Sequence, residues 1–137
     1  MTTERKNINR GFRKLRVWED AIDLYVTINK TLSKIAMHNL KTSSNIIDAA
    51  NSISRNIAEG YGRRGKKEYL NFLNYSLGSC AECYSGYFSF YKAGLITEET
   101  YEEIDKLHYK VENQLIKLIE SLQRKNTDDW SDNFNDN

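Results

Sequence analysis

Residues 53–73 of this chain read ISRNIAEGYGRRGKKEYLNFL. Apolar residues at helical spacing end near Ile57 and resume at Tyr69. Gly60 and Gly62 lie between them, and glycine accepts the left-handed conformation that often follows a helix C-terminus. The stretch therefore predicts one helix end, a turn and a second helix start, with four cations in the turn. These cations are Arg63, Arg64, Lys66 and Lys67.

Apolar stripes on both sides of this turn recur every three or four residues, which indicates amphipathic helices. We expect helices over about 17–37, from a cap within 42–45 to Gly60 or Gly62, from the basic turn to Gly94, and from a Thr97 cap to about residue 125. The sequence contains no proline, which would cost about 3 kcal/mol inside a helix. Four long helices with short connections predict an all-α, up-down-up-down antiparallel four-helix bundle.

The 137 residues fit one domain with charged ends. Residues 1–16 carry six basic side chains and one acid, whereas residues 127–137 carry four aspartates and no base, in a chain of net charge +1. We predict a flexible basic arm over 1–14, the bundle over 15–126 and an acidic, disordered tail over 127–137. Trp130 and Phe134 could anchor that tail on a neighbour.

No apolar run is long enough to cross a membrane, and the N-terminus lacks a signal-peptide core, so we expect a cytoplasmic protein. Cys80 and Cys83 form a C-x-x-C spacing within a helical pattern, where packing thiols are favoured over a redox or zinc site. His108 lies on an apolar seam. Without paired acids, a positioned base or a phosphate loop, we expect no enzyme, no metal and no cofactor.

A more specific pattern is NIAEGYGRR at residues 56–64, followed by KEY at 67–69 and FL at 72–73. Together with LRVW at 15–18, it resembles the 23S rRNA intervening-sequence proteins, the S23 family, over about residues 12–122. The resemblance implies a four-helix bundle that assembles into a homopentamer and has no established enzymatic activity. Members are often encoded within insertions in 23S rRNA genes.

The chain is also similar to the accessory protein of diversity-generating retroelements, a basic pentamer thought to bind nucleic acid and a reverse transcriptase. The resemblance therefore implies self-association, RNA or DNA as a ligand, and a protein partner such as a reverse transcriptase. The family usually has a proline before NIAEG and a base one turn earlier. Here Ser54 and Asp48 stand at those places, so we expect a straighter second helix with a less basic face.

Phosphate contacts dominate nucleic-acid affinity and need several cations within reach of one backbone. We therefore predict that the nucleic-acid-binding residues are Arg63, Arg64, Lys66 and Lys67, supported by Arg55, Arg13 and Arg16. A second interpretation is a solvated turn whose cations pair with Glu59 and Glu68 at little energetic gain. A third is a protein–protein scaffold or adaptor with no nucleic-acid role.

The remaining residues of the family pattern are interpreted as structural. Asn56, Glu59 and Tyr61 are predicted to form a buried polar network or to cap the turn, with Gly60 and Gly62 turning the chain. An aromatic band could stack bases, but its helical spacing favours core and subunit contacts. The band comprises Tyr69, Phe72, Tyr84, Tyr87, Phe88 and Tyr91.

Overall fold

The computed structural model describes residues 7–35 and 39–125, and these residues form helices and turns with no strand. The predicted all-α class is confirmed, but a short fifth helix joins the four long ones. In chain order the elements are the 3-10 helix η1 (Ile8–Lys14), α1 (Arg16–Leu32), α2 (Leu40–Gly62), α3 (Lys66–Lys92) and α4 (Glu98–Gln123).

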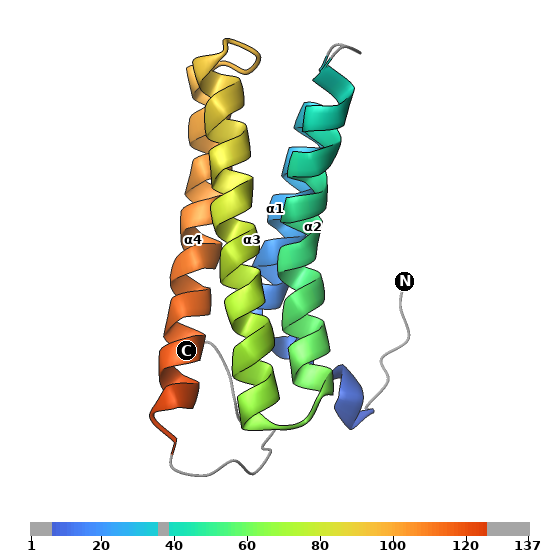
Figure 1. The fold of residues 1–137 in the computed structure, drawn as a ribbon, viewed down its shortest axis with the longest axis vertical. Coiled ribbons are helices and arrows are strands. Elements are labelled where there is room, and N and C mark those ends of the chain that lie inside the picture. Colours follow the sequence, from blue (N-terminus) through green and yellow to red (C-terminus); the bar gives the residue numbers. More distant parts are fainter. Residues whose placement is uncertain (1–6, 36–38, 126–137) are drawn as a thin grey trace.

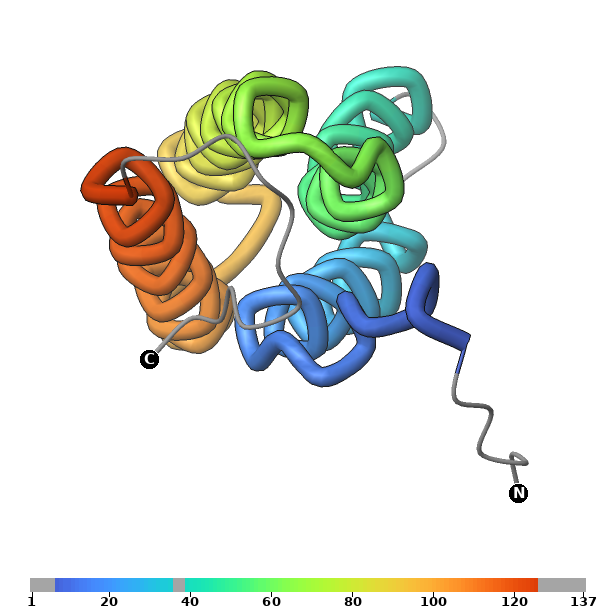
Figure 2. Tube along the Cα trace, turned by 90° about the horizontal axis from the view of Figure 1, so that it is seen from below, coloured from blue at the N-terminus to red at the C-terminus, as the bar shows by residue number. Residues whose placement is uncertain are grey.

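The four long helices lie side by side along one axis (Figure 1). Following the colours, the chain rises through α1, returns through α2, rises through α3 and returns through α4 (Figure 1). Seen from below, the helices occupy four corners, and each packs against the two beside it (Figure 2). This arrangement brings the starts of α1 and α3 to the same end as the last turns of α2 and α4.

The apolar stripes face inward and form one core between the four helices. Two polar side chains tie the helices together within it. Ser76 Oγ donates to the Ile53 carbonyl at 2.9 Å, which links α3 to α2. His108 is buried, and its Nε2 donates to the Cys80 carbonyl at 2.8 Å, linking α4 to α3. Both bonds satisfy buried groups that would otherwise be costly to desolvate.

Residues 8–14 correct the predicted flexible arm, because they form η1 and dock on α1 and α2. The Phe12 ring lies edge-on to Trp18 at 5.2 Å and to Tyr61 at 6.1 Å. A Cβ on Gly11 would overlap the Tyr61 hydroxyl, so only glycine permits this approach. The sequence showed no helical period here because seven residues of 3-10 helix are too few to establish one.

Helix boundaries agree with the sequence where capping chemistry is specific. Thr97 caps α4 by accepting from the Thr100 amide at 3.1 Å, as predicted. Gly94 follows α3 with φ +77°, a conformation that glycine adopts without strain. The N-terminal half differs, since α1 ends at Leu32 instead of near residue 37 and α2 begins at Leu40, inside the predicted loop.

The absence of proline leaves α2 as one continuous helix from Leu40 to Gly62 (Figure 1). That α2 is straighter than in family members with a proline at the position of Ser54 stays a prediction. The predicted acidic tail over 127–137, with Trp130 and Phe134, lies outside the described residues. So do residues 36–38 and the first six residues of the predicted arm.

The two cysteines are free and buried in the core, which confirms their interpretation as packing thiols. Burial raises the pKa of the Cys80 thiol to about 12 and raises the pKa of Cys83 further. An unfolded thiol has a pKa of about 8.5, so the unfolded chain releases these protons first as pH rises. Stability should therefore decrease above about pH 8.5.

We expect iodoacetamide at pH 8 to leave both thiols unmodified in the native protein, because the thiolate is the reactive form. In guanidinium chloride both should be alkylated, and mass spectrometry counts the added groups. Rapid modification of the native protein would contradict the burial described above.

Candidate nucleic-acid interface

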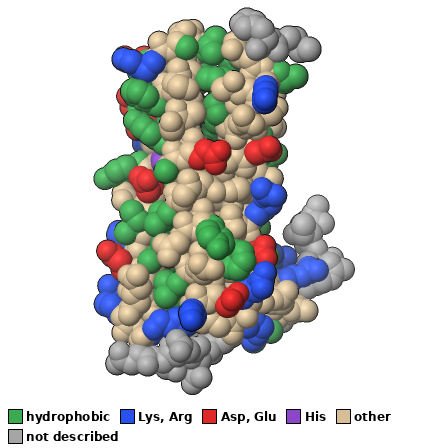
Figure 3. Space-filling model, in the orientation of Figure 1, with side chains coloured by type: hydrophobic (Ala, Val, Ile, Leu, Met, Phe, Trp, Pro, Cys, Tyr) green, Lys and Arg blue, Asp and Glu red, His purple; other side chains and the backbone are tan. Residues whose placement is uncertain are grey.

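Cations gather at the end of the molecule where α2 passes into α3, and they come from η1, the starts of α1 and α3, the α2–α3 turn and the residues that follow α4. Figure 3 shows Lys and Arg side chains collected toward the lower part of this face. Figure 2 looks onto the same end, with η1 beside the ends of α1 and α2. We call this region the basic end. Its cations are Arg10, Arg13, Lys14, Arg16, Arg63, Arg64, Lys66, Lys67, Arg124 and Lys125.

The turn between α2 and α3 consists of Arg63, Arg64 and Gly65. Its first two amides continue the hydrogen bonding of α2, with Arg64 N donating to the Tyr61 carbonyl at 3.2 Å. Arg64 has φ +61°, which holds the chain in a tight reversal. Gly65 precedes α3 and offers its first-turn amides no side-chain cap. The cations therefore lie next to the N-terminal end of α3, and both features favour the binding of anions.

Arg63 is committed to contacts within the protein. Its guanidinium donates to Glu59 Oε2 at 2.8 Å, lies 3.7 Å from Glu68 Oε2, and sits 5.0 Å from the centre of the Phe72 ring. The hydrogen bond to Glu59 raises the pKa of Arg63. The side chains of Arg63, Glu59 and Glu68 are each about half exposed. The predicted pairing of a turn cation with Glu59 and Glu68 is therefore found for Arg63.

The other three cations of this stretch, Arg64 in the turn and Lys66 and Lys67 at the start of α3, are placed differently. Lys66 Nζ donates to the Lys125 carbonyl and so joins the start of α3 to the end of α4. Arg64 and Lys67 are exposed. Among the described residues, no ion pair involves Lys67. Arg16 is exposed at the start of α1, and Arg13 is partly buried in η1. The docking of η1 brings Arg13 to the basic end, where the start of α1 also places Arg16.

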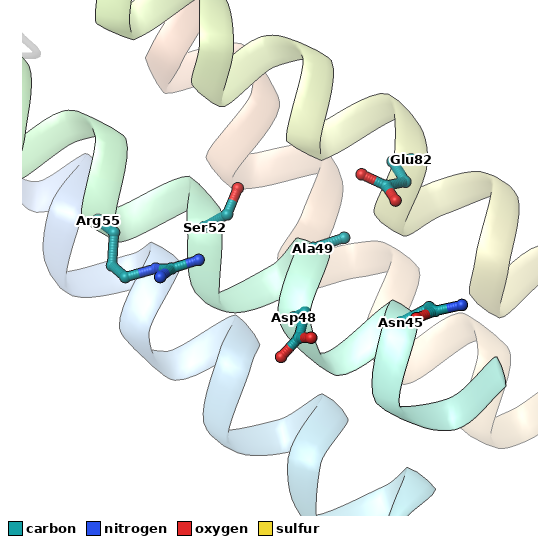
Figure 4. A pocket seen from close by; sticks show the side chains of 6 residues that line it. All are labelled: Asn45, Asp48, Ala49, Ser52, Arg55 and Glu82. Carbon is teal, nitrogen blue, oxygen red and sulfur yellow. The ribbon is translucent and has the colours of Figure 1, made fainter. Parts of the chain in front are cut away.

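Arg55 does not join this group. It precedes Arg63 by eight residues, which corresponds to about 12 Å along the helix. Figure 4 shows it at one end of a shallow groove that Asp48, Ser52 and Glu82 also line. Two carboxylates and one guanidinium give the lining of the groove a net negative charge, which disfavours phosphate. The structure thus separates Arg55 from the other six predicted binding residues.

The predicted buried network of Asn56, Glu59 and Tyr61 does not form. Asn56 Nδ2 donates to the Ser52 carbonyl one turn back at 2.9 Å, and Glu59 is directed to Arg63 instead. Tyr61 is buried and packs edge-on to Tyr69 at 5.9 Å. The reason is the helical period, which turns Glu59 outward while Tyr61 faces the core.

The glycines of this pattern have a packing role. A Cβ on Gly60 would lie 2.8 Å from Phe72 Cβ and 3.2 Å from the Tyr69 carbonyl oxygen. Gly60 therefore lets α2 and α3 approach closely beside the turn. Gly62 is less constrained, with only Asn9 Oδ1 near its hypothetical Cβ, at 3.6 Å.

The predicted site residues omitted several residues of this region, among them Arg124 and Lys125 at one place and Asn71 and Tyr75 at another. Arg124 and Lys125 follow α4, and the packing places the end of α4 beside the start of α3. Asn71 and Tyr75 are exposed on α3, next to the basic end. Asn71 and Tyr75 lie outside the apolar stripe of α3, and this was the feature of the sequence that could have indicated their exposure.

The family model described as 23S rRNA-intervening sequence protein matches residues 13–117. The chain belongs to this family. The match confirms the resemblance drawn from NIAEGYGRR, and it covers α1, α2, α3 and most of α4. In this intervening-sequence protein the family match also contains Arg13, Arg16 and the α2–α3 turn. Comparison with curated proteins returns no match.

Two further findings concern other kinds of site. No helix in residues 7–35 and 39–125 is long and apolar enough to cross a membrane. Over the same residues, His, Cys, Asp and Glu side chains form no group of three or more that could hold a metal ion.

Proposed function

We propose that this intervening-sequence protein is a non-enzymatic, oligomeric nucleic-acid-binding protein of the cytoplasm. Its up-down-up-down antiparallel four-helix bundle presents the basic end to the phosphates of RNA or DNA. The contacts come from Arg64 and Lys67, with Lys66, Arg63, Arg13 and Arg16 around them. Phosphate recognition of this kind is independent of base sequence.

The observation that supports this proposal is the convergence of cations at one end, from η1, the starts of α1 and α3, the α2–α3 turn and the residues that follow α4. Exposed charges contribute little to the stability of a fold. Folding alone therefore does not explain why cations should cluster at one end. Ten cations gather there, and Arg63 pairs with Glu59 and Glu68. The basic end therefore keeps an excess of positive charge in a chain whose net charge is only +1.

Self-association strengthens the same interaction. A homopentamer, the assembly that the family resemblance implies, carries five basic ends, and linked sites raise apparent affinity by orders of magnitude without any new contact. Multi-angle light scattering should give about five times the chain mass of 16.0 kDa. A monomer at micromolar concentration would contradict this part of the proposal.

Binding should weaken steeply as salt rises, because each neutralised phosphate releases counterions. Fluorescence anisotropy of a labelled oligonucleotide, titrated at 50 and 200 mM salt, measures this dependence. For about six contacts we expect affinity to fall roughly a thousand-fold between these concentrations. The proposal would be refuted by no binding at 50 mM salt, or by binding that ignores salt.

A protein scaffold or adaptor, with a reverse transcriptase as one partner, is the alternative, and one observation favours it. Tyr109 on α4 is 64% exposed beside a groove between α3 and α4, lined also by Tyr84 and Asp105. Exposed aromatic residues are enriched where proteins meet. A pull-down that recovers a partner after nuclease treatment, and loses it in Tyr109→Ala, would favour the scaffold.

The non-enzymatic part of the proposal has its own support. The groups with strongly raised pKa include Cys80, Cys83 and Tyr87, for which burial is the main cause. Tyr87 OH donates to Asp105 Oδ1 at 2.7 Å and ties α3 to α4. These groups belong to packing contacts of the bundle. Asp105 also lines the groove beside Tyr109, but Cys80, Cys83 and Tyr87 are buried in the core, whereas perturbed groups at an active site converge on a cleft.

A further inference from the structure

An aromatic pair lies on the outer face of α3, immediately beside the basic end. The rings of Phe72 and Tyr75 meet edge-on, with centres 5.4 Å apart and planes at 87°. The Arg63 guanidinium also lies over the Phe72 ring, 5.0 Å from its centre. Tyr75 is 52% exposed. The three side chains form a continuous surface of π and cationic groups, which we call the platform.

The Tyr75 ring is held in place on this surface. Asn71 Nδ2 donates to the Tyr75 hydroxyl at 3.3 Å, and Phe72 supports the ring from the side. A positioned ring loses little conformational freedom when a ligand packs on it. Lys67, Asn71 and Tyr75 follow one another at four-residue spacing, so they form one ridge of α3.

The surroundings of Tyr75 are polar but uncharged. From residue 69 to 81 the sequence contains no Asp, Glu, Lys or Arg. Asn71, Asn74 and Gly78 are exposed on either side of Tyr75. Amide side chains both donate and accept hydrogen bonds, as base edges do. The face therefore changes along α3 from phosphate-binding cations to an aromatic ring flanked by amides.

We propose that the basic end binds single-stranded nucleic acid, with one unpaired base stacked on Tyr75. The phosphates of the same strand lie over Lys67 and Arg64. This inference rests on the proposed nucleic-acid binding and specifies the class of ligand. A duplex keeps its base faces within its own stack, so it can use the cations but not the platform. Stacking on an aromatic ring adds affinity for any base.

The test compares a fluorescein-labelled, unstructured 20-nucleotide strand with a blunt duplex of equal length, by anisotropy at 50 mM salt. The variants are Tyr75→Ala, Tyr75→Leu, which keeps apolar bulk without a ring, and Tyr109→Ala as a control in an exposed tyrosine on α4. Both Tyr75 variants should lose about ten-fold in affinity for the strand. Their affinity for the duplex, and all binding by Tyr109→Ala, should be unchanged.

Failure of this inference differs from failure of the proposed function. If strand and duplex bind with the same salt dependence and neither Tyr75 variant weakens the strand, nucleic-acid binding stands and the platform is refuted. If the Tyr75 variants change the oligomer mass in light scattering but not strand affinity, the ring is a subunit contact and the platform is again refuted. If the wild-type protein binds neither ligand, both proposals are overturned.

Discussion

Replacing Arg64 and Lys67 together by glutamate should lower the affinity for a single strand by at least about a hundred-fold at 50 mM salt. Each change removes one phosphate interaction and adds a repulsive charge at the basic end. The slope of log affinity against log salt should become shallower by about 1.4, since each of the two cations contributes about 0.7 on a single strand. Anisotropy over a salt series measures both effects.

The experiment must distinguish the effect of a lower net charge from the effect of losing two cations at the basic end. The matched control is Lys34→Glu with Lys41→Glu, two exposed residues at the opposite end of the bundle. It changes net charge by the same amount. We expect less than a three-fold loss of affinity in the control, because charges beyond the Debye length of about 10 Å at 0.1 M salt are largely screened. Equal losses in the two variants would mean that binding is not confined to the basic end.

Gly60→Ala should destabilise the fold by about 1–3 kcal/mol, even though alanine is the better helix former. The new Cβ would lie 2.8 Å from Phe72 Cβ and 3.2 Å from the Tyr69 carbonyl oxygen. Because one of these atoms is backbone, relief requires α2 and α3 to move apart. Denaturant unfolding followed by circular dichroism gives the change in the free energy of unfolding.

Gly78→Ala is the matched control for this effect. Gly78 lies in the middle of α3, and nothing lies within 4 Å of a Cβ built on it. Its replacement should stabilise the protein by about 0.5–1 kcal/mol through helix propensity alone. The two variants therefore move stability in opposite directions for the same chemical change. A stabilised Gly60→Ala variant would disprove the close contact between α2 and α3.

Much of the fold was predictable because its signals are local. The spacing of apolar residues predicted four long helices. Thr97 correctly predicted the start of α4, and Gly94 correctly predicted the end of α3. The less regular N-terminal half was harder. The docking of η1 depends on Phe12 meeting Tyr61, residues far apart in the chain, and no local pattern encodes that contact.

The candidate site was predictable to a smaller extent. The turn cations were evident from GRRGKK at residues 62–67, but their environments were not. Arg63 is held by Glu59 and Glu68, whereas Arg55 lies in a groove with two carboxylates. Whether a cation pairs with a carboxylate or can bind a ligand depends on distances of a few ångströms. The separation of two residues in the sequence determines such distances only when both lie in one helix.

The sequence by itself determined the family, the helices and the basic turn, because each rests on contiguous residues whose chemistry acts locally. Only the tertiary structure decided that Arg13 and Arg16 of the N-terminal segment and Arg124 and Lys125 of α4 share one end with that turn. The same packing left Tyr75 exposed beside Arg63 and Phe72. The physical reason is that burial of four apolar stripes in one core fixes which helix ends meet, and that choice depends on the whole chain at once.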